Sequence, residues 1–197
     1  MSVFEIFPSA PLARPGPRHR PPVPKALPEI VSGQLWLVEA AAVKAEPSAP
    51  ARHAIDGANV VIYDRALAAR LGNSFPLGTY AEPAAIGDGA AARCIRFARD
   101  GWSVVRLMAP RLPHRDRVRR IREIVEALAA AKVPAASPVR VLAEAAYGIR
   151  EEADTTLDRL ADAVATYDRD TRLTIVIDAF VGAAAASRAG AANGLAG

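Results

Sequence analysis

Short apolar runs alternate with amphipathic stretches along most of this chain. The apolar runs predict five buried strands, over residues 35–38, 59–63, 102–107, 139–142 and 173–177. Helices are predicted over 65–71, 84–100, 116–132 and 157–164, with a loop over 72–83. In the helix over 116–132, one buried face is predicted by the spacing of Val118, Ile121, Val125 and Leu128. Strands that alternate with helices in this way predict an α/β fold, a mostly parallel sheet with helices on both faces.

The two ends of the chain differ in composition from its middle. Residues 1–30 hold eight of the 16 prolines, which predicts an extended arm. Such an arm is a linker, a segment that packs on a neighbouring subunit, or a contact to nucleic acid. Residues 181–197 form a tail rich in Ala and Gly. Between the ends we expect an α/β domain over 31–145 and a helix–strand segment over 146–180.

Composition and charge narrow the class of protein. The chain is 51% hydrophobic and carries a formal net charge of +4, which permits anionic partners without requiring them. Cys94 is the only cysteine, so the chain has no intrachain disulfide, and we expect a buried structural thiol and a reducing cytoplasm. His19, His53 and His114 lack the spacing of metal ligands, so we expect no metal. No apolar run is long enough to span a bilayer.

Three segments in order carry a resemblance to a known family. They are SGQLWLV at 32–38, DGANVVIYDR at 56–65 and ARDGWSVVRL at 98–107. Together they resemble the N-terminal domain of the uroporphyrinogen-III C-methyltransferases, which are tetrapyrrole methylases. The resemblance covers about residues 32–145. It implies the α/β fold of that domain, with the second domain truncated to a remnant over 146–180. It also implies methyl transfer from S-adenosylmethionine to a tetrapyrrole, without a metal.

The cofactor-facing loops of this family have lost their glycines here. The family follows its first strand with Gly-Ala-Gly-Pro-Gly-Asp, where this chain has EAAAVK at 39–44. It follows its Val-Val-Arg-Leu strand with Lys-Gly-Gly-Asp-Pro, where this chain has MAPRL at 108–112. By resemblance, the substituted cofactor positions are Glu39, Ala41, Val43, Met108, Ala109 and Pro110. Because a side chain at a glycine position of positive φ is costly, we expect an altered cofactor cradle.

Charged residues near the strand ends are the candidates for a site. Asp64 is the loop acid with a candidate catalytic role, although an Asp64–Arg65 pair could instead cap the helix that follows. The candidates for binding tetrapyrrole carboxylates are Arg65, Arg106, Arg111 and Arg115. Six arginines between 111 and 122 are also consistent with a solvated helix face or with contact to nucleic acid.

Three functions stay open on this basis. The first is a degenerate, non-catalytic relative without a cofactor, a tetrapyrrole-binding or assembly subunit in cobalamin or sirohaem metabolism. The second is an active methyltransferase that uses S-adenosylmethionine in a rebuilt site, where a homodimer supplies the missing wall of the cleft. The third is a basic nucleic-acid-binding module, which the absence of aromatic interleaving disfavours. We expect a homodimer.

Overall fold

The computed structural model describes residues 27–40, 48–71, 74–85, 88–109, 114–145, 148–168 and 170–181. Nearly all of the expected arm and tail therefore lie outside the described residues. None of the helices in these ranges is long and apolar enough to cross a membrane.

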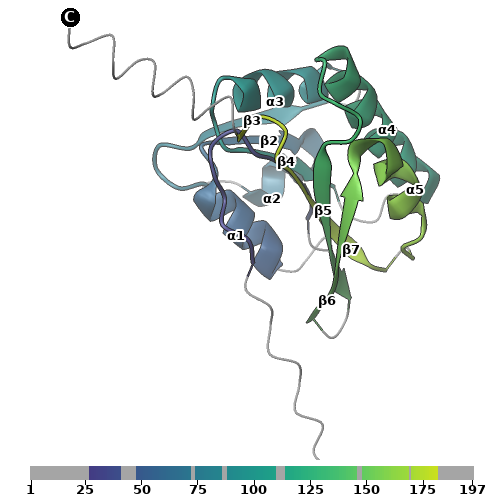
Figure 1. Cartoon of the computed structure of the whole chain (residues 1–197). Coiled ribbons are helices and arrows are strands. Elements are labelled where there is room, and N and C mark those ends of the chain that lie inside the picture. The colour runs from purple at the N-terminus through teal and green to yellow at the C-terminus, as the bar shows by residue number, and fades with distance from the viewer. Residues whose placement is uncertain are drawn as a thin grey trace, which may run out of the picture.

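Seven strands of the described chain form one sheet, in the order β3-β2-β4-β1-β7-β5-β6 (Figure 1). β1, β2, β3 and β4 are parallel, and β7 is antiparallel to both β1 and β5. β5 therefore runs in the direction of β1, and β6 returns antiparallel beside it. The fold is α/β, with a sheet that is mostly parallel at its core. The strands are β1 Leu35–Glu39, β2 Val60–Asp64, β3 Tyr80–Ala84, β4 Val104–Met108, β5 Pro138–Ala145, β6 Gly148–Thr156 and β7 Arg172–Ile177.

Helices cover both faces of the sheet. The α-helices are α1 Ala49–Gly57, α2 Ala68–Leu71, α3 Ala90–Arg99, α4 His114–Ala130 and α5 Leu160–Ala165. Short 3₁₀ turns precede two of them, at Arg65–Leu67 and Leu157–Arg159. In Figure 1, α1 lies to the left of the sheet and α4 and α5 lie to its right. Ser48 caps the N-terminus of α1, since its hydroxyl accepts a hydrogen bond from the Ala51 amide at 3.3 Å.

The alternation of side chains along β1 divides the core into two layers. Trp36 and Val38 pack on the face covered by α1, while Leu35 and Leu37 pack on the face covered by α3, α4 and α5. All four side chains are buried. Because both faces of β1 are covered, the strand is an unbroken apolar run, and the sequence pattern identifies it well.

Several elements differ from the sequence-based expectations. The loop expected over 72–83 contains most of β3, and the helix expected from residue 84 begins at Ala90. β3 contains Pro83, which an edge strand tolerates because one row of its amides has no neighbouring strand. α1 and β6 were not expected at all.

The segment that we interpreted as the remnant of a second domain is joined to the same sheet. Residues 146–180 include β6, α5 and β7. β7 lies between β1 and β5, with Leu35 opposite Ile177 and Val38 opposite Thr174. Its apolar side chains therefore complete the core beside β1.

Candidate functional site at the carboxyl edge of the sheet

Charged side chains gather where the parallel strands end. Glu39, Asp64 and Met108 are the last residues of β1, β2 and β4, which are neighbours in the sheet. Ligands of open parallel sheets bind beyond this edge. α4 packs beside it and contributes Arg117 and Arg120, one turn apart on the same face of the helix.

Asp64 is held by two arginines and a backbone amide. One carboxylate oxygen accepts a hydrogen bond from Nη2 of Arg106. The other accepts from Nη1 of Arg120 at 2.5 Å and from the Ala109 amide at 2.7 Å. Arg106 also donates to the carbonyls of Ile62 and Leu107, at 3.2 and 3.1 Å. The carboxylate is therefore fully engaged inside the protein, and it does not cap the 3₁₀ turn that follows it.

These partners keep Asp64 ionised. Burial by itself would raise the pKa of Asp64, but Arg106, the Ala109 amide and Arg120 outweigh it, and the pKa lies below its ordinary value. A carboxylate with a low pKa and three donors is a weak proton acceptor. The arrangement suits a structural ion pair better than a general base.

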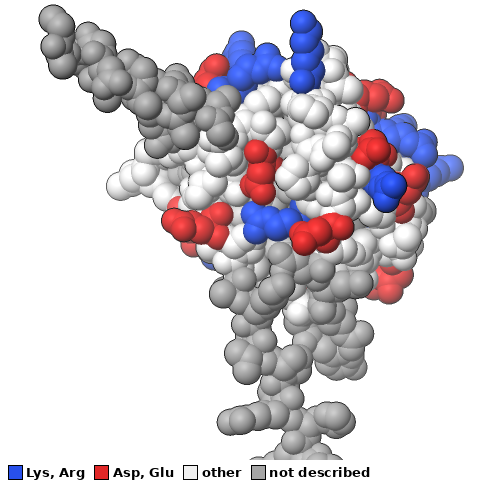
Figure 2. All heavy atoms as spheres, in the orientation of Figure 1, with Lys and Arg blue, Asp and Glu red and all other residues white. Residues whose placement is uncertain are grey.

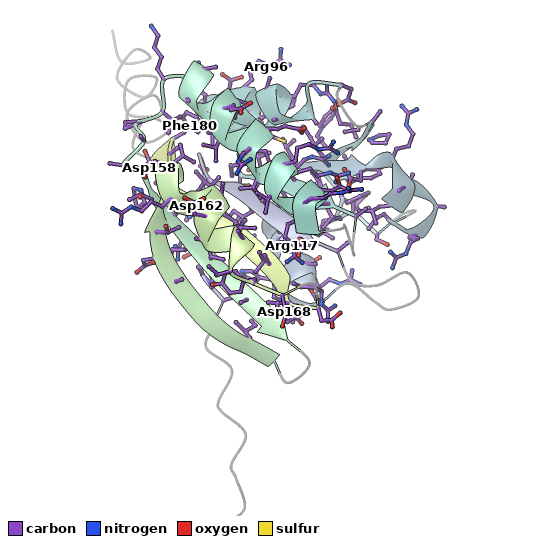
Figure 3. All side chains as sticks on the ribbon, turned by 90° about the vertical axis from the view of Figure 1, so that its right-hand side faces the viewer. Arg96, Arg117, Asp158, Asp162, Asp168 and Phe180 are labelled. Carbon is purple, nitrogen blue, oxygen red and sulfur yellow. The ribbon has the colours of Figure 1, made fainter. Side chains whose placement is uncertain are left out.

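A second buried ion pair lies at the end of β1. Glu39 accepts two hydrogen bonds from Arg117, from Nε at 2.8 Å and from Nη2 at 3.2 Å, and a third from the Leu173 amide at 2.9 Å. Arg117 also donates to the carbonyls of Asp168 and Thr171, both at 2.9 Å. Figure 3 shows Arg117 above Asp168, which lies on the loop between α5 and β7. This pair therefore connects β1, α4 and the start of β7.

The ionised form of Glu39 is less stabilised by its surroundings than that of Asp64. Burial raises the pKa of Glu39 above its ordinary value, and Arg117 and the Leu173 amide offset only part of that effect. The side chains of Glu39 and Arg117 are 7% and 5% exposed. A buried pair of this kind is stable only while both partners are present.

The structure places the sequence-predicted site residues in different surroundings. Arg106 is buried against Asp64, whereas Arg65 and Arg115 are exposed. Among the expected cofactor positions, Glu39 and Met108 are buried, and Ala109 is half-buried with its amide bound to Asp64. Four further candidates lie outside the described residues: Ala41, Val43, Pro110 and Arg111.

Two hollows lie on either side of α4. One, with a volume of about 230 Å³, lies between α4 and the start of α3 and reaches Arg106, Met108 and Arg120. The other, of about 440 Å³, lies between α4 and α5 and is lined by Arg115, Arg119 and Arg122 among others. Glu123 lines both hollows, so they are adjacent across the helix. The two hollows contain two different expected arginines, Arg106 and Arg115, and neither contains Arg65.

Sequence reasoning missed the inward arginines of α4. The buried positions Ile121, Ile124 and Leu128 form one stripe, and Arg117 lies four residues before Ile121 on the same stripe. Our expected face included Val118, which is only half-buried. An arginine in register with a buried stripe was the signal, because such a residue needs a buried acid as its partner.

The exposed charges do not form one basic field on the visible face. In Figure 2, Lys and Arg side chains lie next to Asp and Glu side chains on this face. On α4, for example, Arg119 lies 3.4 Å from Asp116 and 3.9 Å from Glu123. Mixed signs of this kind weaken the long-range attraction that nucleic acid requires.

Comparisons with known proteins do not identify the family of this chain. No family model and no curated protein matches the chain. Among solved structures, the chain is similar to a cobalamin biosynthetic enzyme, the cobalt precorrin-4 methyltransferase CbiF, with 11% sequence identity and a TM-score of 0.31. That similarity covers 73% of this chain and 93% of the other. Values this low do not identify a family.

Proposed function

We propose that this chain is a methylase-like protein that does not transfer methyl groups and that binds an acidic tetrapyrrole, as a binding or assembly subunit. The observation that supports the proposal is the set of internal hydrogen bonds made by the two carboxylates at the strand ends. Both Glu39 and Asp64 have every oxygen engaged by internal donors. Each carboxylate therefore already accepts three internal hydrogen bonds, which a cofactor at this edge would have to displace.

The position of Glu39 adds to this. The resemblance aligns it with the first glycine of the cofactor loop, where the family brings its backbone close to S-adenosylmethionine. Here a buried carboxylate and the Arg117 guanidinium occupy the end of β1. A sulfonium cofactor at this edge would have to separate the pair, which costs about 3–5 kcal/mol when one partner of a buried pair is lost.

The outer face of α4 supports binding of a polycarboxylate. Arg115, Arg119 and Arg122 line the larger hollow, whose volume of about 440 Å³ is within the usual range of ligand sites. Glu123 and Glu126 line the same hollow, and Arg119 is paired with Asp116 and Glu123. Arg115 and Arg122 are therefore the guanidinium groups that suit carboxylates at the rim of a ligand. A tetrapyrrole with acidic side chains has that chemistry.

The test uses the full chain and two titrations. In calorimetry, S-adenosylmethionine should give no binding heat, and radiolabelled methyl transfer to uroporphyrinogen III should be absent. Uroporphyrin III, the oxidised form of that tetrapyrrole, should bind and change its fluorescence. The double variant Arg115→Gln/Arg122→Gln should weaken binding by about tenfold or more, since each charged hydrogen bond contributes about 1.5–3 kcal/mol.

A matched control separates specific contacts from overall charge. Arg52 is an exposed arginine on α1, on the opposite face of the sheet. The variant Arg52→Gln should leave uroporphyrin binding unchanged. Tight binding of S-adenosylmethionine would contradict the non-catalytic proposal. Equal loss of uroporphyrin affinity in the control and in the double variant would contradict the proposed binding face.

A further inference from the structure

We propose that the smaller hollow, between α3 and α4, is a binding site for a short aliphatic carboxylate, either a free acid or the acidic side arm of a larger molecule. The hollow has a volume of about 230 Å³. That is below the usual range for whole drug-sized ligands, which is about 300–1,000 Å³. It can hold a fragment but not a macrocycle.

The charge at the base of the hollow favours an anion. Arg106 and Arg120 both line it, and Asp64 is the acid to which both are bonded. Two positive charges against one negative charge leave an excess of one positive charge. The side chains of Arg106 and Arg120 are only 10% and 13% exposed, so solvent screens this excess poorly.

Arg120 makes fewer hydrogen bonds to the described residues than Arg106 does. Within the described part of the chain it makes a single hydrogen bond, from Nη1 to Asp64. Among the described residues its Nε and Nη2 groups have no acceptor, and these are the groups that we expect to bind a ligand. Arg106, in contrast, already donates to Asp64 and to two carbonyls. We assign Arg120 as the ligand-binding arginine and Arg106 as the residue that fixes Asp64 behind it.

The remaining acid at the hollow does not neutralise this charge. Glu123 lies at the rim, its side chain is 56% exposed, and its ion-pair partner is Arg119 at 3.9 Å. Because the Glu123 carboxylate is exposed, solvent screens its charge, and it offsets the buried guanidinium groups less than Asp64 does. At the opposite wall the hollow meets the N-terminus of α3, where the Ala90 amide already donates to the Asp88 carboxylate at 3.2 Å, so we assign the ligand's charge to Arg120 and not to this helix end.

The apolar walls of the hollow favour an organic anion over an inorganic one. Ala90, Met108 and Ile124 line the hollow and are all buried apolar residues. Apolar walls around a single guanidinium suit a ligand with a methylene stem and a charged head. Inorganic phosphate would lose hydration against these walls without a matching set of donors. A carboxylate on a two- or three-carbon chain satisfies both surfaces.

This inference rests on the proposed function only for the larger molecule, because the chemistry of the hollow does not depend on it. Since Glu123 lines both hollows, a molecule bound on the outer face of α4 could extend one acidic arm across the helix to Arg120. The tetrapyrrole would then contact α4 from both sides.

The experiment is an amide NMR titration of the full chain with sodium propionate, and in parallel with sodium phosphate at equal ionic strength. Propionate should produce saturable shifts at the Ala90 and Ala91 amides. Arg120→Gln should weaken that binding about tenfold or more, since one charged hydrogen-bonding group is lost. Arg52→Gln, an exposed arginine on the opposite face of the sheet, should leave it unchanged. Ala91→Leu should block the hollow without changing any charge, which keeps the test valid if Arg120→Gln folds poorly.

The outcomes distinguish the carboxylate site from the proposed function. No saturable propionate shift, an equal shift in Arg120→Gln and wild type, or tighter binding of phosphate would overturn the carboxylate site. Propionate binding without uroporphyrin III binding would support this site and contradict the proposed function. Uroporphyrin III binding that Arg120→Gln and Ala91→Leu leave unchanged would support the proposed function and contradict the arm in this hollow.

Discussion

Replacing Arg117 with methionine should destabilise the protein strongly. Arg117 is buried, and it donates to Glu39 and to the carbonyls of Asp168 and Thr171. Methionine fills a similar volume but donates no hydrogen bond. The variant therefore leaves Glu39 buried with the Leu173 amide as its one remaining donor in the described chain.

The size of the effect follows from the proton equilibrium of Glu39. Without Arg117 the carboxyl group can protonate in the folded state, and at pH 7 this costs about 1.36 kcal/mol for each unit between pH 7 and its unfolded pKa of about 4.3. That limit is about 3.7 kcal/mol, close to the loss of about 3–5 kcal/mol expected when a buried pair is broken. With a urea m-value of about 2 kcal/mol/M, the unfolding midpoint should fall by roughly 2 M.

The sign of the pH dependence provides a second check. A carboxyl whose folded pKa is raised destabilises the folded state progressively as the pH rises above its unfolded pKa. The difference in the free energy of unfolding between Arg117→Met and wild type should therefore become smaller from pH 7 to pH 5. At pH 5 the cost of protonating Glu39 falls to about 1 kcal/mol. Urea unfolding followed by circular dichroism measures both values.

Two further variants test the mechanism. Adding Glu39→Gln to Arg117→Met removes the buried charge but keeps an acceptor for the Leu173 amide, so the double variant should be more stable at pH 7 than Arg117→Met alone. Arg119→Met is the matched control. Its side chain is 62% exposed, and its loss should change the free energy of unfolding by less than about 0.5 kcal/mol. If the double variant were the less stable one, or if the difference between Arg117→Met and wild type did not change with pH, an unpaired buried charge would not be the cause.

Three other predictions use the same unfolding assay or a simple reagent. The stability advantage of wild type over Asp64→Asn should be largest above about pH 4 and fall as the pH drops further, because the pKa of Asp64 is lowered in the folded state and the group loses its stabilising charge on protonation. Burial raises the pKa of the Cys94 thiol to about 12, so Ellman's reagent should modify it in urea and not in the folded protein. Gly33→Ala should cost about 2 kcal/mol or more, because a Cβ there would lie 2.6 Å from the Phe180 carbonyl oxygen at a φ of +82°. Gly78→Ala, at a φ of +90° with open space around it, should cost only about 1–2 kcal/mol.

The sequence predicts the central strands of the sheet because burial on both faces requires them to be mostly apolar. β1, β4 and β7 are covered on both faces and are mostly apolar, so their existence is evident from the residues alone. β3 and β6 are the edge strands. The first contains a proline and the second is largely polar, and their pairing is decided by neighbours distant in the chain.

The candidate site was less accessible to sequence reasoning for a related reason. Asp64 and Arg106 were recognised as candidates, but their pairing joins residues 42 positions apart. Glu39 and Arg117 are 78 positions apart, and the sequence suggests neither that Glu39 is buried nor that it has a partner. Ion pairs between distant elements depend on topology, whereas a glycine lost from a loop is visible in the residues themselves.

Buried ion pairs, and not glycines, occupy this edge of the sheet. A glycine-rich loop leaves space beside the backbone for a ligand. Here Glu39 lies at the end of β1 and accepts hydrogen bonds from Arg117 of α4, which therefore lies across this edge of the sheet. Arg117 also donates to the carbonyls of Asp168 and Thr171. A ligand that separated this pair would lose about 3–5 kcal/mol, which weakens its affinity roughly a hundredfold to several thousandfold. Glu39→Gly alone would leave Arg117 buried without its acidic partner, so it should destabilise the fold.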